Sequence, residues 1–328
     1  MKSSRSLKAN NNLLMKRTMK YLIAPFLILL TIGFSSCEKV IEAKDLPQQD
    51  PMLVANSLVY ADSAVRISVS SSKSILSGKD YKLIPQAVCD LFEDDVYLGS
   101  VNTNSNGLSV FPVIAKENKK YSIQVGASGY KTISASTMVP PKISITDIQR
   151  YDTTNSQYKF SDYSQGQGGK YLGGTGKFRF AIIDDITVKN YYKASPVVIV
   201  YDASGDSRLV QDTYISSNVT GLGDGALYSG ALGIDDQTIV NGKEVQVDIS
   251  VTFNYPVEVF MFDPVRVEVY LEVANLSQDY YKYQKTLNDQ VSIGAGFFSE
   301  PVLVYTNIAN GAGILAGANN RLLKIYPQ

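Results

Sequence analysis

The feature that most constrains this chain is a strict alternation of apolar and polar residues in two stretches. Every second residue is Val or Ile from 245 to 251, and Val or Leu from 265 to 273. Successive side chains of a β-strand point to opposite faces, so each stretch predicts a strand with one buried and one solvated face. The chain also has 22 Tyr and 12 Phe and few helical stretches. The sequence therefore predicts an all-β fold.

The body of the chain divides into two predicted domains at Pro140-Pro141, because consecutive prolines favour an extended linker. Residues 51–140 carry short strand candidates separated by turn-rich segments, and this spacing resembles a small transthyretin-like or immunoglobulin-like β-sandwich. Residues 141–328 are predicted to form a larger β-sandwich-type domain. The strand candidates of the first domain cover residues 53–59, 65–70, 87–92, 107–114, 121–125 and 131–137.

Three local signals refine the second domain. Ser277 is the predicted N-cap of one helix near residues 277–289, where apolar residues recur at helical spacing. Asn241-Gly242 predicts a type I′ hairpin turn, because both positions of that turn need positive φ. Residues 166–176 contain six glycines and are interpreted as a flexible loop, since no strand-glycine-helix context supports phosphate binding there.

The first residues of the chain have the order of a secretory signal. A basic region precedes an apolar run over residues 21–32, which is too short to span a bilayer as a helix. Ser35-Ser36 stands directly before Cys37, as in the lipobox of bacterial lipoproteins. We therefore expect a signal peptide over residues 1–36, lipidation of Cys37 and a tether over residues 37–50; the alternative is an ordinary cleaved signal and an incidental cysteine. Three start codons stay open, namely Met1, Met15 and Met19.

Several residue types bear on function by their absence or their balance. The chain has no His, which removes most hydrolase triads and most zinc sites, so we expect no enzymatic activity, no metal and no cofactor. From Cys37 onwards there are 25 basic and 31 acidic residues, a balance that disfavours nucleic acid. Cys89 alternates with Ala87 and Leu91, which predicts a buried thiol in a strand rather than a reactive one.

Acidic pairs and adjacent tyrosines are the patterns that a ligand site would use. Asp202 and Asp206 have the oxygen spacing that opens some calcium loops, but no Glu follows at the twelfth position, and solvated turn residues are the simpler interpretation. Paired carboxylates could hydrolyse a glycoside only if two of them faced one cleft. Adjacent tyrosines could stack on a sugar or divide between core and surface. The remaining acidic pairs are Asp94-Asp95, Asp184-Asp185 and Asp235-Asp236, and the tyrosines are Tyr191, Tyr192, Tyr280, Tyr281 and Tyr283.

Several segments together resemble a family of Bacteroidota outer-membrane lipoproteins defined by a domain of unknown function, DUF4249. Ala312 stands where that family more often has a larger residue. The resemblance implies an outer-membrane lipoprotein, often encoded beside a TonB-dependent transporter, with no agreed ligand. The segments are Cys37, Leu53–Asn56, Ala87–Phe92, Gly129-Tyr130, Val139-Pro140, Asn190–Tyr192, Tyr280–Tyr283, Phe298–Pro301 and Asn307–Ile314.

These observations lead us to expect a non-enzymatic, lipid-anchored accessory or binding protein of a nutrient-uptake system. It would lie on the outer membrane, with the cell surface favoured over the periplasmic face by the acidic Glu38 after the lipidated cysteine. Its partners would be the membrane, a TonB-dependent transporter and a glycan or peptide ligand. The alternative is a carbohydrate-binding or adhesive surface lipoprotein.

Overall fold

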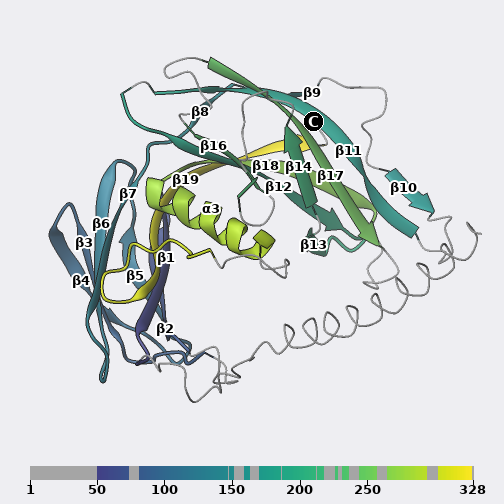
Figure 1. Cartoon of the computed structure of the whole chain (residues 1–328). Coiled ribbons are helices and arrows are strands. Elements are labelled where there is room, and N and C mark those ends of the chain that lie inside the picture. Colours follow the sequence, from purple (N-terminus) through teal and green to yellow (C-terminus); the bar gives the residue numbers. More distant parts are fainter. Residues whose placement is uncertain are drawn as a thin grey trace, which may run out of the picture. The chain divides into compact units, whose positions relative to one another are not determined.

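The computed structural model describes most of the chain from Asp50 onwards, and Asp50–Gln328 forms one compact unit. Within the described residues the fold is mostly β with a single helix, which confirms the predicted class (Figure 1). No helix in this part of the chain is both long enough and apolar enough to cross a membrane. The predicted signal peptide and Cys37 lie outside the described residues, as does the tether before Asp50. The described residues are 50–73, 81–146, 148–150, 159–162, 170–185, 187–211, 213–217, 226–227, 231–235, 244–256, 264–293 and 302–326.

The first part of the unit is a small β-sandwich, as predicted. Strands β1, β2 and β5 form one layer, and a sheet in the order β4-β3-β6-β7 forms the other. Buried side chains of both layers, among them Ile67, Leu91 and Phe111, fill the core between them. Strand β4 is the one member that the strand candidates omitted. The strands are β1 (Leu53–Tyr60), β2 (Ala64–Ser71), β3 (Val88–Glu93), β4 (Val96–Asn102), β5 (Leu108–Ile114), β6 (Lys119–Gly126) and β7 (Ile133–Val139).

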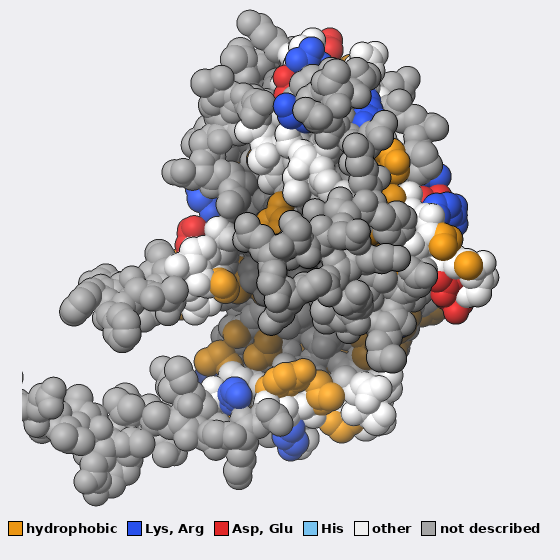
Figure 2. Space-filling view, turned by 90° about the vertical axis from the view of Figure 1, so that its right-hand side faces the viewer, with side chains coloured by type: hydrophobic (Ala, Val, Ile, Leu, Met, Phe, Trp, Pro, Cys, Tyr) orange, Lys and Arg blue, Asp and Glu red, His pale blue; other side chains and the backbone are white. Residues whose placement is uncertain are grey.

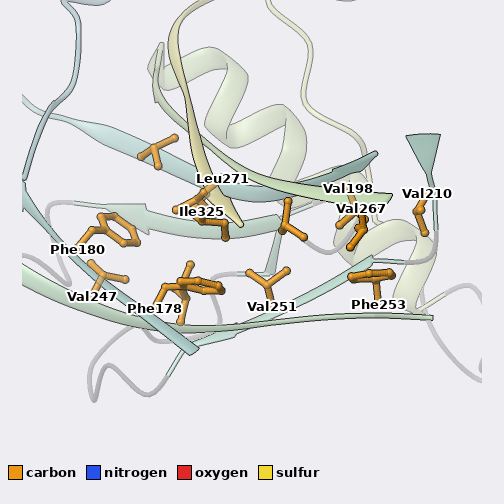
Figure 3. Close-up of a cluster of buried hydrophobic side chains, with 14 of the residues drawn as sticks. Phe178, Phe180, Val198, Val210, Val247, Val251, Phe253, Val267, Leu271 and Ile325 are labelled. Carbon is orange, nitrogen blue, oxygen red and sulfur yellow. The ribbon is translucent and has the colours of Figure 1, made fainter. Parts of the chain in front are cut away.

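The second part is a larger sandwich with one helix. A six-stranded sheet has the order β10-β11-β17-β14, with β8 and β9 paired to β11. Its buried face packs on β12 and β18, and Phe178, Phe253 and Leu271 lie in the core between the layers (Figure 3). The elements are β8 (Ser144–Ile145), β9 (Gln149–Arg150), β10 (Lys159–Asp162), β11 (Lys170–Ile183), β12 (Tyr191–Tyr201), β13 (Ser207–Val210), β14 (Thr213–Ser217), β15 (Ala226–Leu227), β16 (Ala231–Asp235), β17 (Glu244–Pro256), β18 (Arg266–Leu276), α3 (Gln278–Ile293) and β19 (Ala312–Tyr326).

One nine-stranded sheet serves both sandwiches, in the order β15-β16-β12-β18-β19-β1-β2-β5 with β13 beside β12. Strand β19 connects the two sandwiches, because it pairs in parallel with β1 and antiparallel with β18. Accordingly, Leu315 lies in the small core, whereas Ile325 lies in the larger one. The domain boundary at Pro140-Pro141 stays a prediction. In the structure, β19 pairs with β1 and so extends the β1-β2-β5 layer of the small sandwich.

Two glycines allow β19 to lie this close to its neighbours. Gly313 has φ +104°, and a Cβ there would stand 2.1 Å from the Ala55 carbonyl oxygen. A Cβ on Gly317 would stand 2.1 Å from the Met138 carbonyl oxygen. Both gaps are far below a van der Waals contact, so a side chain at either position would push β19 away from the small sandwich.

One local prediction needs correction, and a second one is not tested by the described residues. The prediction of a flexible glycine-rich loop over residues 166–176 is wrong in its second half, because Lys170–Gly176 belongs to β11. A Cβ on Gly173 would stand 2.5 Å from the Phe253 carbonyl oxygen, so the close packing of β11 and β17 accounts for that glycine. The predicted turn at Asn241-Gly242 lies outside the described residues. The described strands on either side of it, β16 and β17, belong to different sheets and do not form a hairpin with each other.

Candidate ligand-binding cleft

The helix α3 begins where the sequence predicts. The Tyr280 backbone N–H donates to Ser277 Oγ over 3.3 Å, which confirms the N-cap. The Gly317 N–H donates to the same oxygen over 3.1 Å, and the Ser277 N–H donates to the Gly317 carbonyl over 2.8 Å. The cap therefore fixes the start of the helix on β19. The helix continues to Ile293, beyond the predicted end near residue 289.

A cleft of about 700 Å³ opens beside this helix start. Its walls come from five places: the residue before β6, the end of β7 with the two prolines, the loop before β12, the end of β18 and the first turn of α3. The lining residues are Asn118, Met138, Val139, Pro140, Pro141, Asp185, Thr187, Val188, Lys189, Asn190, Tyr191, Asn275, Leu276, Ser277, Gln278 and Asp279.

The loop wall of the cleft is held by Asn190 and Asp185. The buried Asn190 amide lies 3.1 Å from each of three acceptors, namely Asp184 Oδ1 and the carbonyls of Asp185 and Val188. The Asp185 carboxylate accepts from the N–H and the hydroxyl of Thr187, and these hydrogen bonds lower its pKa. The predicted acidic pair thus holds the loop in place.

The proline wall is held by two asparagines from adjacent strands. Asn275 Nδ2 donates to the Pro141 carbonyl over 3.2 Å, and Asn319 Nδ2 donates to the Pro140 carbonyl over 3.2 Å. Asn275 Oδ1 is buried and has no hydrogen-bond partner among the described residues. Most buried side-chain oxygens accept at least one hydrogen bond, so Asn275 Oδ1 is an unsatisfied acceptor in the wall of the cleft.

The adjacent tyrosines are mostly core residues. Tyr191 and Tyr281 are buried against each other, with ring centroids 5.0 Å apart. Gln278 Nε2 donates to the Tyr191 hydroxyl over 2.8 Å, and the buried Tyr192 hydroxyl donates to Asp184 Oδ1 over 2.8 Å. All three rings are buried, which removes them as stacking platforms for a sugar.

The first turn of α3 also holds the segment that precedes β19. The Tyr305 hydroxyl and Asn307 Nδ2 both donate to the Asp279 carboxylate. Burial, followed by the hydrogen bond to Asp279, raises the pKa of Tyr305 to about 12. Asn307 also brackets Leu315 of β19, accepting from its N–H and donating to its carbonyl. The residue patterns of the sequence predict no role for Tyr305 or Asn307. The sequence signal for Asn307 is that it begins the last segment of the family resemblance.

A second polar cluster lies on β18, away from the cleft. The Glu268 side chain is 8 % exposed and accepts from four donors over 2.8–3.0 Å. The hydrogen bond from Lys324 is the main cause that lowers the pKa of Glu268 to about 2, and two tyrosine hydroxyls add to it. The donors are Tyr201, Tyr270, Arg266 and Lys324.

The other candidate residues are dispersed. Cys89 is fully buried in the small core, which confirms the predicted burial of its thiol, and this burial raises its pKa. Asp94 and Asp95 form the β3–β4 turn and pair with lysines 119 and 120. Asp202 accepts hydrogen bonds within its own turn from Ser204 and from the Asp206 N–H. The side chains of residues 235 and 236 lie outside the description.

The chemistry of the cleft is that of hydrogen bonding. Its lining offers amides, hydroxyls, the Lys189 ammonium and two carboxylates, and both carboxylates already accept hydrogen bonds from neighbouring side chains. Across the described residues no three His, Cys, Asp or Glu side chains come together as metal ligands would. Two apolar side chains at the rim, Met138 and Val188, remain about half exposed. This combination suits a polar ligand or a segment of a partner protein.

Comparison with solved structures finds 23 chains that are similar to this one, among them the following three. An α-L-rhamnosidase from Dictyoglumus thermophilum matches with 12 % identity and a TM-score of 0.29, over 70 % of this chain and 28 % of that one. A β-glucuronidase from Bacteroides uniformis matches with 12 % identity and a TM-score of 0.19, over 64 % and 30 %. The major pilin RrgB from Streptococcus pneumoniae matches with 10 % identity and a TM-score of 0.20, over 70 % and 49 %. At these scores the likeness carries no argument about activity.

The chain spans less than half the length of each of these structures. No curated protein sequence matches it. The family model of DUF4249, a domain of unknown function, matches residues 41–322. Since this match covers most of the chain, the protein belongs to the DUF4249 family.

Proposed function

We propose that the protein is a lipid-anchored accessory or binding component of an outer-membrane nutrient-uptake system and has no enzymatic activity of its own. The observation that carries this proposal is Cys37, which follows a basic and apolar leader and two small serines. Acylation there would hold the body at a membrane. A TonB-dependent transporter is the proposed partner, and the cell surface is the favoured face.

The cleft supports the binding part of this proposal. It lies between two polar walls, and its rim carries the half-exposed Met138 and Val188. Exposed apolar side chains beside polar groups are an arrangement that a protein partner can cover, through both apolar contacts and hydrogen bonds. We therefore assign the cleft as the surface that meets the transporter.

Co-purification tests the proposal directly. The full chain with a C-terminal tag is recovered from gently solubilised outer membranes, and mass spectrometry identifies both its partners and its N-terminal peptide. We expect a diacylated or triacylated peptide beginning at Cys37 and a transporter in stoichiometric amount. A Cys37→Ser variant is the control, because it should leave the body folded while removing the protein from the membrane fraction.

A matched pair of variants tests the cleft. Val188→Glu, at the rim, should lower transporter recovery at least tenfold, because it places a carboxylate in an apolar contact. Val265→Glu changes another exposed valine, directly before β18 (59 % exposed, against 45 % for Val188), and should leave recovery unchanged. Equal recovery with both variants would remove the cleft from the interface. An acylated protein that is always recovered alone would instead favour direct ligand binding, as in a carbohydrate-binding surface lipoprotein.

A further inference from the structure

The small sandwich has a second distinctive surface where the chain enters the described fold at Asp50. Met52 and Ser72 lie side by side there: the Met52 N–H donates to Ser72 Oγ over 3.0 Å, and the Ser72 N–H donates to the Met52 carbonyl over 2.8 Å. The Ser71 N–H donates to the Lys82 carbonyl over 2.8 Å, which places residues 81–83 beside the same strand end. A hollow of about 530 Å³ joins this region to the β6–β7 turn.

We call this region the entry surface and define it by seven side chains, of which three are lysines and four are apolar or aromatic. Its three lysines are exposed, and so are Met52, Tyr81 and Leu83, with Tyr81 62 % exposed. Figure 2 shows hydrophobic and basic side chains together at the lower end of that view. The seven are Met52, Lys73, Tyr81, Lys82, Leu83, Tyr130 and Lys131.

We infer that the entry surface rests on an anionic lipid bilayer. Apolar and aromatic side chains would enter the boundary between headgroups and acyl chains, and the lysine ammonium groups would lie beside lipid phosphates. Asp50 is the one carboxylate among the described residues that line the hollow. This inference rests on the proposed lipid anchor at Cys37.

Chain connectivity selects this end of the body. Residues 37 to 50 cannot span more than about 45 Å even when fully extended, so an acylated Cys37 keeps Asp50 near the lipid. Anchoring raises the effective concentration of the entry surface at the bilayer, and for this reason contacts that are weak individually can orient the body.

The same geometry places the cleft away from the bilayer. Strand β1 begins at Leu53 in the hollow and ends at Tyr60, roughly 23 Å further along at the usual rise per residue. The cleft includes Asn118 and Met138, at the start of β6 and the end of β7, whereas the β6–β7 turn lies in the hollow. Contact through the entry surface would therefore leave the cleft open to the aqueous phase.

Tryptophan quenching tests the inference, because the chain has no Trp of its own. The acylated full-length protein is placed in vesicles of 70 % phosphatidylcholine, brominated near the top of its acyl chains, and 30 % phosphatidylglycerol. Tyr81→Trp reports on the entry surface. Tyr97→Trp is the matched control, since Tyr97 is similarly exposed at 56 % but lies next to the β3–β4 turn at the other end of the sandwich.

We expect at least twofold stronger quenching for Tyr81→Trp than for Tyr97→Trp. Adding Lys73→Glu, Lys82→Glu and Lys131→Glu to Tyr81→Trp should weaken the quenching in the anionic vesicles and change it little in vesicles of phosphatidylcholine alone. Equal quenching of the two reporters in vesicles that carry the protein by flotation would overturn the inference and leave the anchor standing. Failure of the protein to float with any vesicle would overturn the anchor and with it the proposed function.

Discussion

Strands β17 and β18 share the same alternating pattern, yet their polar faces have different surroundings. On β17 the Asp248 carboxylate pairs with Arg179 of β11, and the two side chains are 28 % and 47 % exposed. On β18 the Glu268 carboxylate is 8 % exposed and all its acceptor positions are used by tyrosine, lysine and arginine side chains. Alternation therefore predicts which residues share a face, but the neighbouring strands decide whether water reaches that face.

The apolar faces of the two strands should behave alike. Leu271 on β18 and Ile249 on β17 are both buried in the larger core. Replacing either by Ala should lower the free energy of unfolding by about 2–5 kcal/mol, because a cavity remains where the side chain was. Chemical denaturation followed by circular dichroism measures this, and a cost below about 1 kcal/mol for one variant alone would break the comparison.

The polar faces should differ clearly. Glu268→Ala should lower the free energy of unfolding by about 1–3 kcal/mol, because two tyrosine hydroxyls lose their acceptor and two cations lose their counter-charge. Glu268→Gln keeps one acceptor oxygen and should cost less. If Glu268→Ala unfolds at the same denaturant concentration as the parent protein, the burial of this carboxylate contributes nothing to stability.

Acid should remove the contribution of Glu268. Its pKa falls from an ordinary value of 4.5 to about 2 in the folded protein, so the unfolded state binds the proton first and the stabilisation is complete only above about pH 4.5. The difference in Tm between the parent protein and Glu268→Gln should shrink as the pH falls from 4.5 towards 2. A difference that stays constant across this range would contradict the lowered pKa.

The smallest effect is expected at the exposed pair. Asp248→Ala should lower the free energy of unfolding by about 0.2–1 kcal/mol, because water and side-chain entropy offset most of an exposed ion pair. The loss should vanish near 1 M salt, where the Debye length is about 3 Å. A double-mutant cycle with Arg179→Ala isolates the coupling, and a value that survives high salt would make β17 resemble β18 after all.

Local structure followed the sequence closely where the signal was local. The predicted N-cap at Ser277 and the buried thiol of Cys89 are both confirmed. The strand candidates of the small sandwich match six of its strands to within a few residues, whereas β4 has a mixed pattern with three exposed side chains at its start and gave no alternation to recognise. Asn241-Gly242 predicts a turn, which lies outside the described residues and stays a prediction.

The cleft could not be predicted because its walls come from segments far apart in the sequence. Asp279, Tyr305 and Asn307 meet only because α3 and the segment before β19 fold over the same sheet. Asn275, near the end of β18, donates to the Pro141 carbonyl although 134 positions separate the two residues in the sequence. Each residue is ordinary in its local context, and the resemblance to a family marked only some of them.

The sequence by itself determined the strand class, the helix start and the pattern of buried faces, since propensity, capping and alternation act over a few residues. Only the tertiary structure decided that β19 joins both sandwiches and that the polar face of β18 is covered. The parallel pairing of the first and last strands depends on the close approach at Gly313, whereas Gly317 allows β19 to lie close to β7. These contacts join residues that are far apart in the sequence. Their free energy is therefore gained only when the whole chain has folded and the surfaces have become neighbours.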